Sequence, residues 1–316
     1  MRYKILIKFV ISFIFIAYII FKIDFGLLAE SVSSVRPFYY LVSFIIVMAN
    51  SVVLAQKYKI VMAPSGIYQP LSELVKINFI CRFYSMFLTT AVGQSVIRWH
   101  LSTKHQKGRL RFVAVMVFER STFFFALFWA VLISFLVAPD LNAKIMTAYI
   151  YPLLAAGLVI LSSFYLYLNC PPVDRLINGI LLGGKTKSDR SRVGTLYDFV
   201  RMFSMYRRQG KTLGVSLCLA FMWHFFFILR VYLLAVSMQV PLSFIDIMWM
   251  ASVVLLIQVL PISFNGIGLR EASYAFLFRI QDLPAEAGVL IGILLFSQLF
   301  FISVIGGILH LFSKER

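Results

Sequence analysis

The stretch Leu260-Pro-Ile-Ser-Phe-Asn-Gly-Ile-Gly-Leu-Arg270 breaks up an apolar part of the chain with turn-forming residues and a positive charge. A similar interruption, Leu88-Thr-Thr-Ala-Val-Gly-Gln-Ser-Val-Ile-Arg98, lies about 172 residues earlier. Each runs from a leucine to an arginine over ten positions, and a lipid-facing helix would not contain so many small, polar and turn-forming residues. Two interrupted apolar segments at corresponding positions indicate a weak internal repeat with a binding site between its halves.

The composition around these stretches is that of a membrane protein. Of 316 residues, 61% are hydrophobic and 14% are charged, and the mean hydropathy is +0.89, whereas soluble domains are about half apolar and about a quarter charged. The length allows seven to nine spans of about 20 residues each, so we expect no separate soluble catalytic domain. The apolar run after Lys4 is long enough to span and has no small-residue cleavage site, which favours a retained first helix.

Seven apolar runs are long enough to cross a bilayer: about 5–23, 38–56, 112–138, 145–168, 211–239, 244–262 and 285–311. Two further segments, about 77–97 and 266–281, are interrupted by arginines and glycines and are predicted to be broken or re-entrant. We therefore predict an all-α integral membrane protein with about seven or eight transmembrane helices. It forms one polytopic domain over residues 1–316, with a first half at about 1–168 and a second at about 211–316.

Basic residues predict the orientation of the chain. Four segments carry nearly all of the formal net charge of +17: 1–8, 57–76, 98–111 and 169–211. Cytoplasmic loops are enriched in Lys and Arg, so these segments and the N-terminus are predicted to be cytoplasmic. The segment 77–97 lies between two of them and is predicted to enter the membrane and return. Counting 266–281 as a crossing puts the positively charged C-terminus on the same side, the assignment that its charge favours.

The connector 169–210 contains apolar residues at helical spacing, among them Val193, Leu196 and Val200, with arginines around them. This pattern is typical of an amphipathic helix on an anionic leaflet. An ordinary solvated connector is an equally good interpretation.

Other functional signals fail. Basic residues in a membrane protein set topology and meet anionic headgroups, so the net charge does not indicate nucleic acid. The segment Gly179-Ile-Leu-Leu-Gly-Gly-Lys-Thr186 matches the phosphate-loop pattern, but a connector between spans cannot supply the βαβ sheet that this loop needs. No metal-ligand spacing occurs, and the three cysteines form no framework. We expect no metal, no cofactor and no catalytic residue.

Ionisable residues at membrane depth supply the candidate site, because such groups are costly in lipid and usually face a cavity, a partner or an ion. The candidates are Arg98, Glu119, Arg120, Arg230, Arg270 and Glu271, with Gly93, Asn265, Gly266 and Gly268 in the interruptions. Arginine binds phosphate bidentately, so several arginines near helix breaks indicate a site for an anionic headgroup. The alternative is that these side chains snorkel or form structural ion pairs.

The stretch from Leu260 to Glu271 closely resembles a signature of the lysylphosphatidylglycerol synthase transmembrane, flippase-like family. The order Phe87-Leu88, Gly93 and Arg98, a basic stretch, and then Val115-Met-Val-Phe-Glu119-Arg120 resembles that family's first motif and its Glu-Arg helix. The resemblance extends from about residue 5 to about residue 311, without the synthase domain. The first motif usually reads Gly-Gly-Asp, whereas this chain has Gly93-Gln94-Ser95, so it lacks the acidic group that would hold a cationic headgroup.

The resemblance implies a stand-alone, multi-pass module of a prokaryotic cytoplasmic membrane that moves or presents an anionic phospholipid or a polyprenyl-phosphate-linked lipid. Under this hypothesis Arg98 and Arg270 hold the phosphate. The other residues have supporting roles: backbone approach for Asn265, Gly266 and Gly268, orientation of Arg270 for Glu271, and lining or gating of the path for Glu119 and Arg120.

Two other classes of function stay open. The first is a membrane-embedded transferase that uses a lipid-linked donor, with Glu119 or Glu271 as general base. The second is a non-transporting accessory subunit of cell-envelope assembly. The expected partners are the bilayer and an anionic lipid headgroup, with no nucleic acid; a homo-oligomer or partners in envelope biosynthesis are left open.

Overall fold

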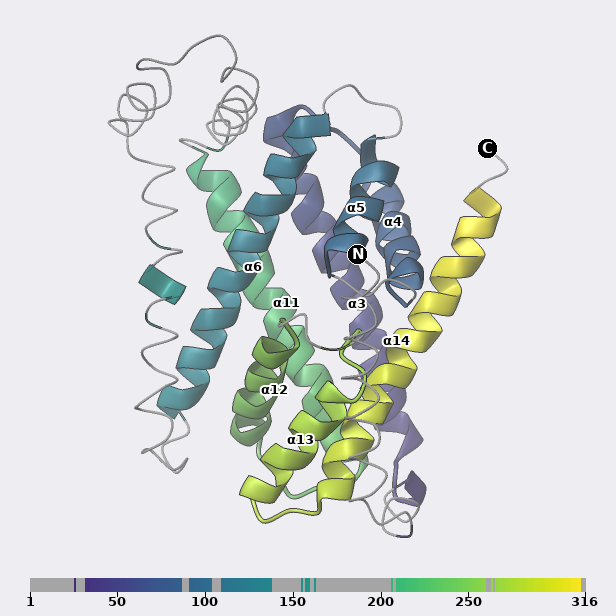
Figure 1. Ribbon diagram of the computed structural model, residues 1–316, viewed down its shortest axis with the longest axis vertical. Helices are drawn as coiled ribbons and strands as arrows, with labels where there is room; N and C mark the ends of the chain where they lie inside the picture. Colours follow the sequence, from purple (N-terminus) through teal and green to yellow (C-terminus); the bar gives the residue numbers. More distant parts are fainter. Residues whose placement is uncertain are drawn as a thin grey trace.

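The computed structural model describes residues 32–86, 91–103, 109–137, 209–259 and 265–313, with the isolated residues 26, 155, 157–159, 162, 206 and 263. The helices over the described ranges are α3 (Pro37–Met62), the short 3₁₀ helix η1 (Ala63–Ser65), α4 (Leu71–Ser85), α5 (Ala91–Thr103), α6 (Arg109–Val137), α11 (Gly210–Ser237), α12 (Phe244–Val259), α13 (Leu269–Ile280) and α14 (Ala285–Ser313). The prediction of an all-α protein is confirmed for these residues, and Figure 1 shows the helices packed as one bundle.

Four of the described helices are long and apolar enough to cross a membrane: α3 with η1, α6, α11 and α14. They correspond to the runs predicted at 38–56, 112–138, 211–239 and 285–311. The predicted span at 5–23, most of the span at 145–168 and nearly all of the connector 169–210 lie outside the described residues. The total number of spans therefore stays a prediction.

Two of these spans, α3 and α11, run antiparallel side by side (Figure 1). Near one end, the Arg36 backbone N–H donates to the Ser237 carbonyl at 2.8 Å. Further along, the Asn50 amide donates to the Trp223 carbonyl at 3.2 Å. These polar contacts between spans satisfy groups that lipid would leave without partners.

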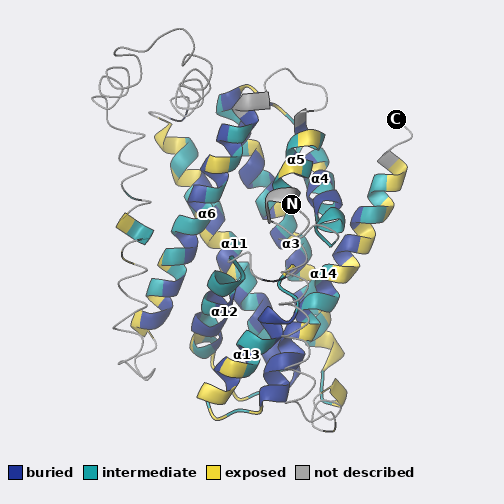
Figure 2. Ribbon diagram, in the orientation of Figure 1, coloured by how far each residue is buried: buried dark blue, intermediate teal, exposed yellow. Residues whose placement is uncertain are grey.

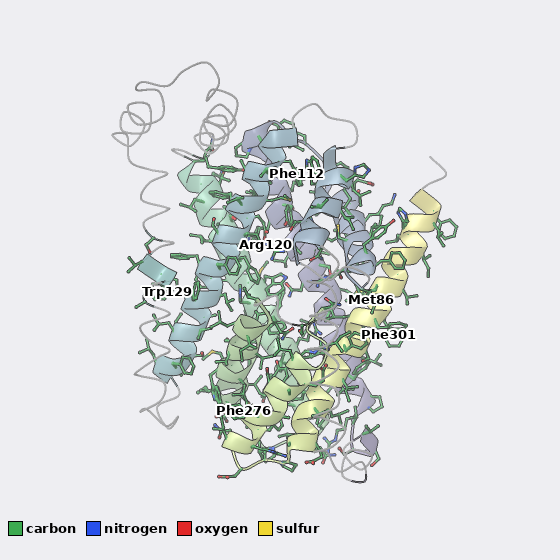
Figure 3. All side chains as sticks on the ribbon, viewed as in Figure 1. Met86, Phe112, Arg120, Trp129, Phe276 and Phe301 are labelled. Carbon is green, nitrogen blue, oxygen red and sulfur yellow. The ribbon has the colours of Figure 1, made fainter. Side chains whose placement is uncertain are left out.

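A helical hairpin, α4 with α5, enters the bundle from the upper end of Figure 1 and returns to that end. At 1.5 Å per residue, the 15 residues of α4 cover about 22 Å, less than the roughly 30 Å hydrocarbon core. Met86, the last described residue before the turn, lies near mid-height in Figure 3. This is the return path predicted for 77–97, but α4 ends at Ser85, α5 begins at Ala91, and Gly93 belongs to the first turns of α5.

A second hairpin, α12 with α13, enters from the lower end and also turns near mid-height (Figure 1). The run predicted at 244–262 contains α12, a shorter apolar helix, and the interruption predicted in 266–281 is present, since α13 begins only at Leu269. The 16 residues of α12 cover only about 24 Å. The chain then reverses through Asn265, Gly266 and Gly268, whose φ values of 51°, 78° and 76° lie in the left-handed region that interrupts a helix.

The last helix, α14, crosses the bundle from the lower to the upper end (Figure 1). α14 therefore ends, at Ser313, at the same end of the bundle as the described parts of the basic segments 57–76 and 98–111. Both α12 and α13 lie in the lower part of this view. Figure 2 shows that the lower half of α14, beside α13, is mostly buried, whereas its upper half exposes many residues.

Glycines allow α14 to pack closely against both hairpins. A Cβ atom on Gly288 would lie 2.6 Å from the Tyr274 carbonyl oxygen of α13, and one on Gly306 would collide with the Phe79 carbonyl oxygen of α4. Small residues at helix contacts permit this close approach in membranes. Both half-length hairpins are thus held against the same spanning helix.

Candidate functional site

The first polar group in the bundle joins α3 to α6 through a buried ion pair. The Lys57 ammonium lies 3.1 Å from Glu119 Oε1, and it also donates to the Glu119 backbone carbonyl at 3.2 Å. The Tyr58 hydroxyl donates to Glu119 Oε2 at 2.9 Å. Both carboxylate oxygens of Glu119 therefore have a donor from α3.

Arg98, on α5, lies against this group. Its guanidinium carbon is 4.2 Å from the centroid of the Tyr58 ring, a cation–π contact. The side chain is buried, and its Nε has no hydrogen-bond partner among the described residues. Arg120, on α6 next to Glu119, lies with its guanidinium 6.0 Å from the Phe123 ring and is half-buried. Figure 3 labels Arg120 in the upper half of the bundle, below Phe112.

The second polar group is built within α13 itself. Arg270 donates to Glu271 Oε1 from Nη2 at 2.6 Å and from Nε at 3.1 Å, and both side chains are buried. Glu271 Oε2 accepts from the Gly268 backbone N–H at 2.7 Å. The carboxylate therefore caps the positive end of the helix that carries it.

Glycines shape the space around this second group. A Cβ atom on Gly292 of α14 would lie 2.8 Å from Glu271 Cγ, so only glycine leaves room for the carboxylate there. Gly266 lies beside Gln258 at the end of α12, and a Cβ would lie 3.2 Å from its Oε1. Asn265 is exposed at the turn. These residues shape the turn at mid-depth.

Arg230, on α11, lies at the level of the second group. Its Nη2 donates to the Leu295 carbonyl of α14 at 3.1 Å, while its Nε has no partner among the described residues. The Arg230 carbonyl accepts from the Ser43 hydroxyl, which in turn accepts from the Gln298 amide at 3.0 Å. Buried polar groups from α3, α11 and α14 thus meet beside this arginine.

Arg82, half-buried on α4, connects the two groups electrostatically. It is repelled by Arg98 on one side, and Arg230 is repelled by both Arg82 and Arg270. The polar centre of the bundle therefore contains six cationic side chains together with the carboxylates of Glu119 and Glu271. The cationic residues are Lys57, Arg82, Arg98, Arg120, Arg230 and Arg270. Within the described part of the chain, positive charge is therefore in clear excess at the centre of the bundle.

The structure divides the residues predicted for the site between these two groups. Arg98 lies with Glu119 and Arg120, and Arg270 lies with Glu271, Gly268 and Arg230. No described interaction joins Arg98 directly to Arg270, the pair expected to hold one phosphate together. The sequence predicts an interruption at Gly93, but Gly93 lies within α5.

Sequence reasoning missed Lys57, Tyr58 and Arg82. Lys57 was assigned to a basic cytoplasmic loop over 57–76, but α3 continues to Met62 and only 2% of Lys57 is exposed. The apolar pattern continues past Lys57 to Val61 and Met62, and this was the available signal. Across the residues that the structure describes, no three His, Cys, Asp or Glu side chains gather as a metal site requires.

The model of the family described as the lysylphosphatidylglycerol synthase TM region matches residues 5–307, nearly the whole chain. No curated protein and no solved structure matches the sequence.

Proposed function

The chain belongs to the family of the lysylphosphatidylglycerol synthase TM region, and from this membership and the central positive charge we propose that it binds the phosphate of an anionic lipid and moves it between leaflets. The membrane is the cytoplasmic membrane of a prokaryote, with the basic end of the bundle on the cytoplasmic side. The lipid is a phospholipid or a polyprenyl-phosphate-linked carrier, since both present a phosphate on an apolar chain.

One observation carries the proposal: Arg98 and Arg230 are buried, have an Nε without a partner, and have no described carboxylate within ion-pair distance. A buried charge without an ion-pair partner is unfavourable, and at membrane depth it usually faces a cavity, a partner or an ion. A phosphate supplies the missing acceptors in the geometry that arginine prefers. We propose Arg98 and Arg230 as the arginines that a phosphate meets in turn along its path, because Arg270 already pairs with Glu271.

The hairpins support the same assignment. Both α5 and α13 begin near mid-height (Figure 1), so the positive ends of two half-length helices lie at the depth where a headgroup would cross. Glu271 caps the start of α13. The start of α5, in the hairpin that carries Arg98, has no carboxylate in its first turn.

Movement without a chemical step is the better supported form of the proposal. A transferase would need a free carboxylate as general base. Glu119 accepts hydrogen bonds from Lys57 and Tyr58, and Glu271 accepts from Arg270 and Gly268. Both candidate bases therefore already have two donors.

The test is to purify the protein in mild detergent and identify the lipids that remain bound by native mass spectrometry. We expect the wild type to retain an anionic lipid, and the double variant Arg98→Ala with Arg230→Ala to lose it. Arg279→Ala, which removes an exposed arginine at the end of α13, is the matched control and should retain the lipid.

Two results would overturn the proposal. Absence of any selectively bound anionic lipid on the wild type removes its basis. Retention of the same lipid by the double variant removes these arginines from the site. Reconstituted vesicles complete the test, because binding without movement between leaflets would favour an accessory role in envelope assembly.

A further inference from the structure

Both oxygens of the Glu119 carboxylate already accept a hydrogen bond from this chain. Lys57 occupies Oε1 at 3.1 Å, Tyr58 occupies Oε2 at 2.9 Å, and all three side chains are buried. The Lys57 ammonium makes a further bond to the Glu119 carbonyl at 3.2 Å. A primary ammonium group, held on a flexible four-carbon stem, is thus placed on the one carboxylate of this group.

The position of Glu119 gives this arrangement a consequence for ligands. Arg98 lies on the ring face of Tyr58, and Glu119 accepts from the hydroxyl of the same tyrosine. Tyr58 therefore contacts two groups of opposite charge. Arg98, which suits a phosphate, lies over its ring, and the carboxylate of Glu119, which suits an amine, accepts from its hydroxyl. A phosphoethanolamine headgroup presents those two charges, a phosphate and a primary ammonium two carbons away. The carboxylate that this ammonium would need, Glu119, already accepts from Lys57 and Tyr58.

We propose that Lys57 is a specificity-determining residue that makes the site select anionic headgroups without an amine and reject those that carry one. This inference rests on the proposed function, since it concerns which headgroup the same site accepts. The tethered ammonium holds the carboxylate without any loss of free-ligand entropy, so a headgroup amine competes poorly for it. The site then rejects an amine-bearing headgroup because the ammonium of that headgroup finds no free carboxylate.

A purely structural role for the Lys57–Glu119 pair predicts something different. If the pair only joins α3 to α6, breaking it lowers stability and lowers the binding of every lipid together. If Lys57 determines specificity, its removal frees a carboxylate next to Arg98, and the preference between two lipids changes. The ratio of the two lipids bound by folded protein therefore separates the roles.

The experiment supplies purified, monodisperse protein with equimolar phosphatidylglycerol and phosphatidylethanolamine of identical acyl chains and counts both by native mass spectrometry. We expect the wild type to bind phosphatidylglycerol preferentially. In Lys57→Met the ratio of bound phosphatidylglycerol to phosphatidylethanolamine should fall by about tenfold or more, as expected for one charge-assisted hydrogen bond gained by the amine. Lys57→Gln, which keeps a donor for Glu119 but removes the charge, should shift the ratio in the same direction and is the milder variant for folding.

Three controls define the outcomes. Lys59→Met removes an exposed lysine of the same helix and should leave the ratio unchanged. Glu119→Gln removes the carboxylate itself and should give no gain of phosphatidylethanolamine. The inference is overturned if the wild type prefers phosphatidylglycerol and both Lys57 variants keep that preference. If the wild type shows no preference for the anionic lipid, the proposed function fails instead.

Discussion

The carboxylates of Glu119 and Glu271, both buried in the bundle, differ in where their partners come from. Each lies next to an arginine in the sequence, Glu119 before Arg120 and Glu271 after Arg270. Glu271 bonds that neighbour and the backbone three residues before it, so its group is complete within one helix. Glu119 bonds Lys57 and Tyr58, about 60 residues away on another helix. The group around Glu119 therefore joins two helices, whereas the group around Glu271 stabilises a turn.

The largest effect should follow from breaking the interhelical pair. Lys57→Ala should lower the free energy of unfolding by about 3–5 kcal/mol, because removing one partner of a buried pair leaves the other charge uncompensated. The measurement is unfolding by a denaturing detergent, followed by circular dichroism. Lys57→Met combined with Glu119→Leu should recover most of the loss, and an effect of Lys57→Ala no larger than that of Lys59→Ala would contradict the prediction.

A smaller effect should follow at Tyr58, the other donor to Glu119. Tyr58→Phe removes the 2.9 Å hydrogen bond and keeps the ring beneath Arg98, so it should cost about 1.5–3 kcal/mol, the range for hydrogen bonds to charged groups. A double-mutant cycle with Glu119→Gln, in the same unfolding assay, measures the coupling. Additive losses in that cycle would show that the hydroxyl and the carboxylate act independently.

The same difference explains what the sequence could predict. The contact between Arg270 and Glu271 and the turn at Asn265, Gly266 and Gly268 depend on residues a few positions apart, where residue type restricts backbone conformation. The hairpin at 77–97 follows from charge on both of its flanks. These features are visible in a short stretch of sequence.

The partners of Glu119 depend on how α3 and α6 pack. The sequence around a lysine within an apolar run does not show which helix that lysine will contact. The same limit applies to the connection between α12 and α13, because irregular backbone inside a bundle depends on the helices that surround it. Arg230 lies in an apolar run and is buried on α11, but whether a described carboxylate lies beside it depends on how the bundle packs.

The group within α13 should be sensitive to the glycine that makes room for it. Gly292→Ala places a methyl carbon 2.8 Å from Glu271 Cγ, and overpacking of this kind should cost about 1–3 kcal/mol. Gly214→Ala, in α11, has nothing within 4 Å of the added atom and should be neutral or stabilise by up to about 1 kcal/mol. Thermal unfolding in mild detergent compares them, and equal midpoints for the two variants would show that Glu271 moves aside freely.

The smallest effect should come from the turn itself. Gly268 has a φ of 76°, so Gly268→Ala should cost about 1–2 kcal/mol, the penalty for an L-residue in the left-handed region. Its N–H still donates to Glu271, so the cap of α13 survives, and the loss should stay below that of Lys57→Ala. Asn265→Gly, at a φ of 51°, relieves strain at the same turn and should not destabilise in the same thermal assay. If Gly268→Ala instead matches Lys57→Ala, the turn couples the two groups, and the local character of the second group is lost.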